Sequence, residues 1–579
     1  MRYQVLATDY DGTLATKGVV GLTTVAALKK LLATGRRLVL VTGRELDELQ
    51  AICPYLDLFE WVVAENGALL YQPLSKEEHT LAKAPSLRFV ETLRKNGCND
   101  MSVGRVIVAT WEPYQRIVLE TIRQLGLELQ VIFNKGAVMV LPTGINKATG
   151  LSAALEKMSI SSHNTIAVGD AENDHAMLNM CEFSVAVSNA IPSIVEAVDW
   201  TTIADHGQGV EELIDKIIAD DLSEWECKLS KHQLEIGTDS NGSVYLLPYS
   251  DSVLIAGPSA SGKSTVATQI VETLAEKKYQ FCLFDPEGDY ENFDQAVVLG
   301  GPKGHPQIDE AMSILDNPAT SIVISMTGMP IPDRPPYFLE LLSKLLEMRS
   351  RFGRPHWLVL DEAHHLLPAD WLPPHGLLPD KLKSMLFITV HPKMLSTSIL
   401  QRLDTLIAVG ADAAENLAYF TYLGKNPSGN RWQCKPLEKG QVLYSTRRRG
   451  DRRIVQVHPC KQDRKRHRRK YAIGELTPER SFYFQGPEKK LNLRAQNLMI
   501  FLQLADGVDD ETWEYHRQEG DYSKWLLVSI KDEELANKVA LIEALQAIDP
   551  LDGRKQIRTI IERDYTLPSE GPLPVPGAF

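Results

Sequence analysis

The segment from Gly257 to Thr265 constrains the fold of this chain more than any other. It reads Gly-Pro-Ser-Ala-Ser-Gly-Lys-Ser-Thr and so matches the pattern GxxxxGK[ST]. The apolar run Ser252–Ala256 precedes it, and the helical pattern Thr265–Ala275 follows. A strand, a glycine-rich loop and a helix in this order form a cradle whose main-chain N–H groups bind phosphate. We therefore expect a nucleotide-binding α/β domain in the middle of the chain.

Individual residues of this region have distinct expected roles. Lys263 would reach the β- and γ-phosphates of ATP, and Ser264 would ligate Mg²⁺. The apolar run Trp357–Leu360 ends in two acids, of which Asp361 would assist Mg²⁺ and Glu362 would polarise the attacking water. An acidic residue directly after Asp361 favours hydrolysis of ATP over transfer of its phosphate to a substrate. The residues expected to bind ATP are Gly257, Ser259, Ala260, Ser261, Gly262, Lys263, Ser264 and Thr265.

A second pair of acids follows the first apolar run, Gln4–Thr8. Asp9 and Asp11 are two residues apart, so an extended backbone would point both side chains the same way, and Gly12 permits a sharp turn after them. Open α/β sheets place ligands at such strand ends. Clustered carboxylates suit Mg²⁺, and one of them could attack phosphorus while the other protonates the leaving oxygen. The alternative is a turn with two solvated acids.

Three later motifs favour the phosphate-handling interpretation. Thr42 follows the apolar run Arg37–Val41 and could offer a hydroxyl to a phosphoryl oxygen. Lys147 begins a helical pattern and could screen the charge between Asp9 and the phosphate. Gly169–Asp174 ends another apolar run and adds acids that could bind metal. The four motifs in this order resemble the haloacid dehalogenase (HAD) superfamily of phosphatases, over about the first 215 residues.

That resemblance implies a fold and a set of roles. The fold is a Rossmann-like parallel sheet with helices on both faces and an inserted α+β cap at about 81–141. The segment Glu65–Ala68 before the cap resembles the Cof-type branch, which includes phosphoglycolate and sugar-phosphate phosphatases. In the cap, Arg105 could meet a substrate carboxylate, and a plain surface role is the alternative. The implied roles are nucleophile for Asp9; general acid/base for Asp11; phosphate ligands for Thr42, Gly43, Lys147 and Asn173; and Mg²⁺ ligation by Asp9, Asp170 and the main-chain carbonyl of Asp11, supported by Asp174.

The middle domain resembles the HerA/FtsK class of ring-forming ATPases. The resemblance lies in the P-loop, in Asp285–Tyr290, in Asp361–His365, and in Ile388–Pro392 followed by Leu406–Gly410. It implies a RecA-like domain in a hexamer, with ATP at subunit boundaries and often a DNA-pumping role. The N-terminal barrel of the DNA-pumping relatives is absent, and His391 stands where many relatives have a sensor Gln. A neighbouring subunit would supply an arginine, for which the candidates are Arg349, Arg351, Arg354 and Arg402.

Composition and turn-forming residues divide the chain into three parts. Turn signals such as Asn241-Gly242 indicate a linker and a hairpin near 223–252, so the expected domains are 1–222, 223–446 and 447–579. The third part begins with the basic stretch Arg447–Lys470 and then looks mainly helical. This stretch could contact nucleic-acid phosphates, or be a solvated loop or one paired with acids of another subunit.

The overall charge and the cysteines exclude several classes. The net charge of −13 argues against attraction of nucleic acid or an anionic membrane to the whole surface. The seven cysteines include no CxxC pair, which indicates reduced thiols rather than disulfides or a zinc site. No signal peptide or apolar run of membrane-spanning length is recognised, so we expect a cytoplasmic location.

The leading hypothesis is a bifunctional hydrolase. Its N-terminal domain would cleave a phosphomonoester through an aspartyl-phosphate, with a small molecule as the favoured substrate, and its middle domain would hydrolyse ATP. A polynucleotide kinase–phosphatase-like enzyme is an alternative, which Asp361-Glu362 and Asp285–Tyr290 disfavour. A nucleotide-gated oligomeric scaffold is the other alternative, although both sets of acids look intact.

Overall fold

The computed structural model describes most of the chain in two compact units. The first unit consists of Met1–Gly257 with Ile270–Val457, and the second of Pro258–Gln269 with His458–Phe579. The residues described are 1–134, 136–229, 233–258, 261–302, 304–371, 378–379, 381–423, 436–447, 450–460, 476, 478–530, 532–545 and 548–565.

An eight-stranded sheet with the order β14-β13-β12-β1-β4-β5-β6-β7 forms the core of the N-terminal domain. The strands β14 to β5 in this order run parallel, whereas β6 and β7 are antiparallel additions at the edge. β1 lies between β12 and β4, so its carboxyl end is flanked on both sides. The strands are β1 (Val5–Asp9), β4 (Arg37–Val41), β5 (Trp61–Ala64), β6 (Leu69–Gln72), β7 (Glu77–Thr80), β12 (Thr165–Gly169), β13 (Phe183–Ala186) and β14 (Trp200–Thr201), with the small hairpin β2 (Ala15–Thr16) and β3 (Val19–Val20) beside them.

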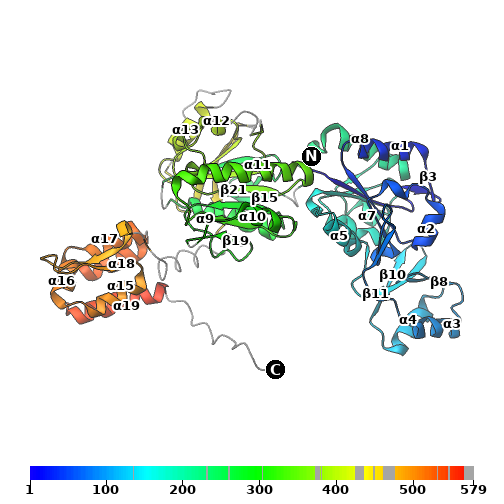
Figure 1. The fold of residues 1–579 in the computed structure, drawn as a ribbon, viewed down its shortest axis with the longest axis horizontal. Coiled ribbons are helices and arrows are strands. Elements are labelled where there is room, and N and C mark those ends of the chain that lie inside the picture. Colours follow the sequence, from blue (N-terminus) through cyan, green and yellow to red (C-terminus); the bar gives the residue numbers. More distant parts are fainter. Residues whose placement is uncertain are drawn as a thin grey trace. The chain divides into compact units, whose positions relative to one another are not determined.

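Helices cover both faces of this sheet, as the strand–helix alternation predicts (Figure 1). Leu28, Leu49 and Leu213 share one apolar cluster under α1, α2 and α8. Leu151 and Met177 belong to a second cluster, on the opposite face, under α5, α6 and α7. The helices are α1 (Leu22–Leu32), α2 (Leu46–Ile52), α5 (Lys147–Lys157), α6 (His175–Met180), α7 (Pro192–Val195) and α8 (His206–Asp220), with 3-10 turns at Leu56–Leu58, Glu65–Gly67 (η2), Ser162–Asn164 and Glu172–Asp174 (η4).

A separate α+β layer is inserted between β7 and α5. Its four-stranded antiparallel sheet has the order β10-β11-β9-β8 and packs its two helices around an apolar core of its own. This is the cap that the sequence predicts. Its elements are α3 (Leu87–Lys95), β8 (Met101–Val103), β9 (Val108–Trp111), α4 (Gln115–Leu125), β10 (Leu129–Asn134) and β11 (Ala137–Pro142).

The middle domain contains an eleven-stranded sheet with the order β16-β15-β25-β24-β23-β17-β22-β21-β18-β20-β19. The seven strands from β23 to β19 in this order are parallel, and the remaining four form an antiparallel edge. The strands are β15 (Leu234–Asp239), β16 (Gly242–Leu246), β17 (Ser252–Ala256), β18 (Phe281–Asp285), β19 (Val297–Gly300), β20 (Ile322–Ser325), β21 (Trp357–Leu360), β22 (Met385–Thr389), β23 (Thr405–Val409), β24 (Gln441–Thr446) and β25 (Arg452–Val457).

The edge of this sheet corrects one expected boundary. β15 and β16 form the hairpin predicted around Asn241-Gly242. However, β25 pairs with both β24 and β15, so the sheet extends to Val457 and the boundary expected at 446 is too early. The helices along this part of the chain are α9 (Lys263–Glu276), α10 (Ile308–Leu315), α11 (Arg334–Phe352), α12 (Thr397–Leu400) and α13 (Ala413–Tyr422), with 3-10 turns at Ile331–Asp333, Ala363–His365 and Pro392–Met394.

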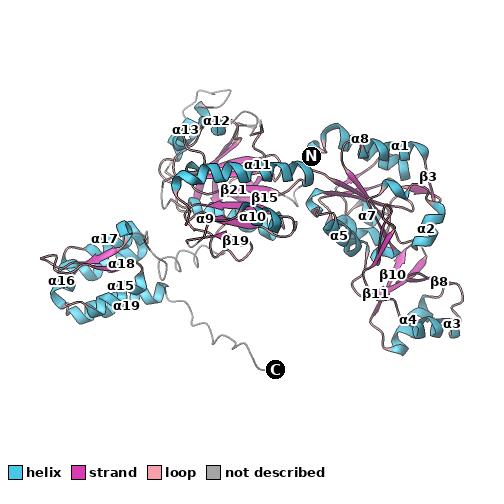
Figure 2. Ribbon diagram, viewed as in Figure 1, coloured by secondary structure: helices cyan, strands magenta, loops and turns pink. Residues whose placement is uncertain are grey.

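The C-terminal region is mainly helical, as predicted (Figure 2). Its helices and one two-stranded hairpin enclose an aromatic core that includes Phe484, Trp513 and Tyr522. Across the part of the chain that the structure describes, no helix combines the length and the apolar character needed to cross a bilayer. The elements are β26 (Phe482–Phe484), β27 (Leu493–Ala495), α15 (Leu498–Gly507), α16 (Asp510–Gln518), α17 (Asp521–Trp525), α18 (Glu533–Glu543) and α19 (Pro550–Tyr565), with a 3-10 turn at Pro478–Arg480 and a π-helical turn at Leu526–Ile530.

Candidate active sites

Three predicted site residues lie at one edge of the N-terminal sheet. Asp9 is the last residue of β1, Thr42 follows β4, and Asp170 follows β12. The parallel pairing aligns Asp9 with Val41 and Thr8 with Val168, so these three strands end at the same level. The edge is therefore built by strand register, and the loops after β4 and β12 flank Asp9.

A buried cluster of charged side chains surrounds Asp9. Lys147 Nζ lies 2.5 Å from Asp9 Oδ1 and 2.6 Å from Asp174 Oδ1. Carboxylate oxygens of Asp9, Asp170 and Asp174 all lie within 4.8 Å of one another. Lys147 is the first residue of α5, where an Asn146 capping box fixes the helix start and so the origin of the lysine side chain.

The electrostatics of the cluster fit a divalent cation. Burial and the neighbouring Asp174 carboxylate raise the pKa of Asp9 to about 8, although Lys147 opposes this. Burial would lower the pKa of Lys147, but the carboxylates of Asp174 and Asp9 outweigh it and raise that pKa. One ammonium cannot balance three buried carboxylates, and oxygen donors are the ligands that Mg²⁺ prefers. Asp9, Asp170 and Asp174 could therefore hold a divalent metal ion such as Mg²⁺.

Asp174 also has a structural part in this site. Its Oδ2 accepts hydrogen bonds from the main-chain N of Asp170 and of Ala171, both at 3.0 Å. A Cβ on Gly169 would lie 2.8 Å from the same oxygen, so glycine is required for this close approach. Asp174 thus shapes the loop after β12 that carries Asp170.

The carboxylate of Asp11 does not join the cluster, contrary to the convergence expected from the spacing of Asp9 and Asp11. Arg44 donates to it from Nε at 2.5 Å and from Nη2 at 2.8 Å. The chain leaves the extended conformation after Asp9 and turns at Gly12, whose φ is +86°. Arg44 is a site residue that the sequence reasoning missed. An arginine directly after Thr42-Gly43 was the available signal.

The predicted phosphate ligands other than Lys147 lie on the two loops that flank Asp9. Thr42 is buried, and its hydroxyl oxygen accepts a hydrogen bond from Arg44 N at 3.2 Å. Asn173 lies in η4 and donates from Nδ2 to Asn66 Oδ1 at 3.0 Å. A Cβ on Gly43 would lie 3.6 Å from Asn173 Nδ2. Asn66 therefore belongs to the same edge, and the sequence reasoning gave it no role.

Arg105 links the cap to the core through ion pairs. Its guanidinium donates to both carboxylate oxygens of Asp47, at 2.5 and 2.8 Å, and lies 3.2 Å from Glu78 Oε2. These hydrogen bonds, first of all that with Asp47, raise the pKa of Arg105. Acids of the core occupy the Arg105 side chain in this structure, which agrees with the alternative surface role, and contact with a substrate carboxylate stays a prediction.

The glycine-rich loop has the local structure that its motif predicts. Gly257 follows β17, Gly262 has a φ of +101°, and α9 begins at Lys263. The lysine side chain is buried, and its Nζ donates to Pro258 O at 3.0 Å. Ser264 and Thr265 lie in the first turn of α9 beside Lys263, where helix N–H groups have no intrahelical acceptor. Ser259 and Ala260 are outside the described residues.

Asp361 and Glu362 directly follow β21, which β22 separates from β17 in the sheet. Asp361 is buried, and Glu362 has a left-handed φ of +39°. His364 Nδ1 lies 3.4 Å from Glu362 Oε2 and 3.3 Å from the hydroxyl of Thr389, the last residue of β22. The acidic end of β21 is thus linked to the predicted sensor strand.

His391, the predicted sensor, lies two residues beyond β22. Its Nδ1 accepts a hydrogen bond from Lys393 N at 3.0 Å, and its Nε2 lies 3.6 Å from Glu415 Oε1. The ring is therefore held by the main chain of the 3-10 turn that follows His391 and by Glu415, an exposed acid of α13.

The candidate arginines separate into internal and accessible ones. Arg354 is buried and donates to Gln280 Oε1, Leu315 O and Asp316 O. Arg349 donates to carbonyls around the start of β21, and burial lowers the pKa of each of these two arginines to about 10. An arginine that saturates carbonyls of its own subunit cannot serve a neighbour, so both predictions are wrong. Arg351 is exposed, and Arg402 donates to Pro379 O at 3.1 Å.

Arg447 corrects the interpretation of the basic stretch. Its guanidinium lies 3.7 Å from the ring centre of Phe420 and donates to Leu400 O and Leu403 O, both at 2.8 Å. Burial lowers its pKa to about 10. Residues 448–449 and 461–470 of the stretch lie outside the described residues. Arg447 is therefore a packing residue and not a phosphate contact.

We expect Arg447→Ala to destabilise the protein by about 1–3 kcal/mol, because the substitution leaves buried backbone carbonyls without a hydrogen-bond donor. Equilibrium denaturation monitored by fluorescence measures this change. Affinity for a DNA duplex, measured at two salt concentrations, should not change. Unchanged stability together with weaker DNA binding would contradict the packing role.

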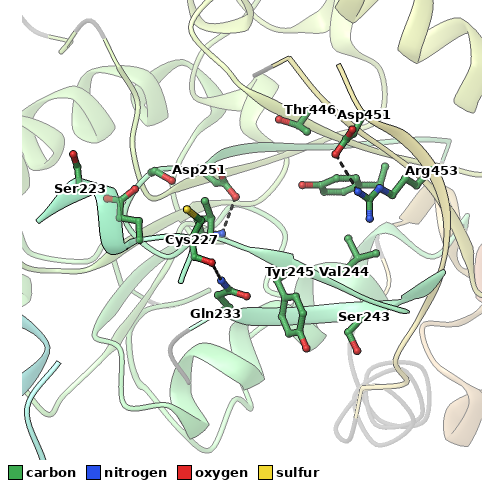
Figure 3. A pocket seen from close by; sticks show the side chains of 14 residues that line it. Ser223, Cys227, Gln233, Ser243, Val244, Tyr245, Asp251, Thr446, Asp451 and Arg453 are labelled. Atoms are coloured by element: carbon green, nitrogen blue, oxygen red, sulfur yellow. Dashed lines mark hydrogen bonds and ion pairs between the residues drawn. The ribbon is translucent and has the colours of Figure 1, made fainter. Parts of the chain in front are cut away.

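A polar pocket of about 320 Å³ lies beside the β15–β16 hairpin (Figure 3). Its Arg453 is paired with Asp451 at 3.1 Å and with Asp239 at 3.4 Å. None of the 14 described residues that line it belongs to a predicted phosphate motif. We therefore assign this pocket no part in phosphate chemistry.

Comparisons with known proteins agree with both domains. The family model described as haloacid dehalogenase-like hydrolase matches residues 6–106 and 106–214, and that described as helicase HerA, central domain, matches residues 234–341. The phosphoglycolate phosphatase of Methanothermobacter thermautotrophicus is 30% identical over 221 residues, which are 36% of this chain and 97% of that protein. Phosphoglycolate phosphatase 2 of Saccharolobus solfataricus is 28% identical over 224 residues, 37% of this chain and 92% of that protein.

The buried acids at the strand ends and these matches define a hydrolase of the phosphatase type. The chain belongs to the haloacid dehalogenase-like hydrolases through its N-terminal domain. A HerA-like domain follows, so the chain is a fusion of the two, as the motifs predict. The predicted resemblances and fold class are confirmed.

Proposed function

We propose that this chain is a bifunctional hydrolase, a Mg²⁺-dependent phosphomonoesterase joined to a ring-forming ATPase. The buried cluster of Asp9, Lys147, Asp170 and Asp174 carries the first half of the proposal. It combines a carboxylate nucleophile, an ammonium group and a donor set for one divalent cation at a single strand end. Ligands bind at the carboxyl edge of parallel sheets, and buried charged groups gathered there are candidates for a functional site.

In the proposed reaction, a carboxylate oxygen of Asp9 attacks phosphorus, and the bond between phosphorus and the ester oxygen breaks. For this step the Asp11 carboxyl group has to leave its ion pair with Arg44, take up a proton and turn toward the leaving oxygen, to which it then gives that proton. Asp11 then takes a proton from the water that attacks the aspartyl-phosphate, so phosphate leaves and both acids return to their first state. Lys147 offsets the negative charge between Asp9 and the phosphoryl oxygens. Bound Mg²⁺ would supply further positive charge there.

We further propose a small phosphomonoester as the substrate. The cap lies over the site, and the relatives that match the N-terminal domain are named phosphoglycolate phosphatases. A screen of phosphate release from small phosphomonoesters and from phosphorylated DNA ends tests this. Preference for DNA ends would contradict it.

For the HerA-like domain we propose ATP hydrolysis in a cytoplasmic, hexameric assembly. Lys263 and Ser264 would bind the phosphates and Mg²⁺, Asp361 would assist the metal, and Glu362 would activate water. Arg351 and Arg402 are the remaining candidates for the arginine supplied by a neighbour. Labelled ATP offered with a 5′-hydroxyl oligonucleotide tests the kinase alternative: label in free phosphate supports hydrolysis, and label on the oligonucleotide overturns it.

Removal of Mg²⁺ should abolish phosphatase activity, because the buried acids would then repel the substrate phosphate. We expect a loss of at least about a hundredfold with excess EDTA, and recovery when Mg²⁺ is restored. Release of phosphate from phosphoglycolate measures this. Full activity in EDTA would show that the acid cluster needs no metal.

A further inference from the structure

The side chains of Asn66 and Asn173 bridge the two loops that flank Asp9. Asn66 N donates to Thr42 O at 2.9 Å, which holds Asn66 against the loop after β4. Asn173 lies on the loop after β12, and its Nδ2 donates to Asn66 Oδ1 at 3.0 Å. Because β4 and β12 are the two neighbours of β1, this amide pair spans the strand end that carries Asp9.

Each amide of the pair has one polar atom without a hydrogen-bond partner among the described residues. Asn66 is fully buried and Asn173 is 8% exposed, yet Asn66 Nδ2 and Asn173 Oδ1 have no hydrogen-bond partner among the described residues. Turning both amides over would only exchange the two roles, so one donor and one acceptor remain free in either assignment. Burial of a polar atom without a partner is unfavourable, and a ligand that pairs with it would recover that free energy.

The backbone at Asn66 is strained. Glu65 and Asn66 have φ values of +51° and +54°, in the left-handed region that residues with a Cβ rarely adopt. Gly67 follows with a φ of +104°, and a Cβ there would lie 1.9 Å from Asn146 O. Such strain persists only where the surroundings enforce it, and it gathers at functional sites.

Glu65 helps to hold this strained backbone in place through hydrogen bonds with the cap. Its buried carboxylate accepts hydrogen bonds from the main-chain N of Arg105 at 2.8 Å, of Val106 at 2.7 Å and of Ile107 at 2.9 Å. A Cβ on Gly104 would lie 2.6 Å from Glu65 Oε1, so the cap backbone can come this close to Glu65 only with glycine at position 104. The residue that holds the cap is thus the immediate neighbour of the residue that faces the phosphate loops.

We propose that Asn66, paired with Asn173, contacts an oxygen of the phosphoryl group, and that Glu65 is a positioning residue that fixes Asn66 when the cap closes. This inference rests on the proposed phosphatase function and adds a residue and a coupling to it. In the open state Glu65 loses three N–H donors, and the strained backbone at Asn66 is released. Binding of phosphate and closure of the cap therefore favour each other.

Two substitutions test the contact made by Asn66. Asn66→Gly removes the amide and suits the positive φ, and Asn66→Asp keeps the shape but faces the phosphate with a carboxylate. We expect inorganic phosphate, measured by calorimetry with Mg²⁺ present, to bind about ten- to a hundredfold more weakly to both variants. KM should rise by a similar factor. The surface variant Asn179→Ala, on α6, is the matched control and should bind as the wild type does.

The coupling is tested with Glu65→Gln, which turns an acceptor oxygen into a donor facing N–H groups. Phosphate should slow hydrogen exchange at the amides of Arg105, Val106 and Ile107 in the wild type and much less in Glu65→Gln. The double variant Glu65→Gln/Asn66→Gly should weaken phosphate binding by less than the product of the two single effects. Strictly multiplicative effects, or equal protection of these amides in both proteins, would overturn the coupling.

The outcomes separate this inference from the function on which it rests. If the wild type binds phosphate but hydrolyses no phosphomonoester, the proposed function fails, and the binding data still decide the role of Asn66. If the wild type is an active phosphatase and both Asn66 variants bind phosphate as it does, the inference fails alone.

Discussion

Asp9→Asn is expected to reduce phosphatase activity by about a thousandfold or more and to leave ATP hydrolysis at the wild-type rate. The amide has nearly the shape of the carboxylate but cannot form the acyl-phosphate. It also removes one of three buried carboxylates beside Lys147, so the fold should tolerate it. Phosphate release from phosphoglycolate and from ATP, measured on one preparation, gives both rates.

Two further results make the Asp9 experiment decisive. The melting temperature of Asp9→Asn should stay near that of the wild type, which excludes unfolding as the cause of the loss. If both activities fall together in a folded protein, the account of two separate sites is wrong.

Lys263→Ala is expected to give the converse result. Removal of the only ammonium in the GxxxxGK[ST] loop takes away the charge that would meet the β- and γ-phosphates. ATP turnover should fall by at least about a hundredfold, and phosphatase activity should be unchanged. The matched control is Lys277→Ala, just after the end of α9, which should leave ATP turnover near the wild-type rate.

A different outcome would change the account of the middle domain. If Lys263→Ala also lowers phosphatase activity in the presence of ATP, the two domains are coupled by nucleotide. If ATP turnover is negligible in the wild type while ATP changes its oligomeric state, the scaffold alternative is correct.

The parts that the sequence predicts well are those fixed by local pattern. The apolar runs that end in Asp9, Thr42 and Asp170 are strands whose parallel register brings those residues to one edge. Lys147 is predicted because a helix start after Asn146 determines where its side chain begins. In these cases spacing along the chain translates directly into position in space.

The parts that it misses depend on tertiary contacts. Glu65 binds main-chain N–H groups of the cap, which no side-chain pattern encodes. Asp11 turns to Arg44 because the direction of the chain after Gly12 cannot be read from a two-residue spacing. Arg354 looks like a surface arginine until packing buries it.

The basic stretch shows the same limit. Arginines at its start suggest a solvated loop, whereas Arg452–Val457 forms β25, an inner strand of the sheet that pairs with β24 and β15. Backbone carbonyls and an aromatic face hold the Arg447 side chain, which composition cannot reveal.

The central claim is that a phosphoryl group passes through Asp9. Brief incubation with a ³²P-labelled small phosphomonoester and Mg²⁺, an acid quench and peptide mapping test it most directly. The account predicts label on the peptide that contains Asp9, equal labelling in Lys263→Ala, and none in Asp9→Asn. Rapid phosphate release with no label on Asp9, or label that persists in Asp9→Asn, would contradict it.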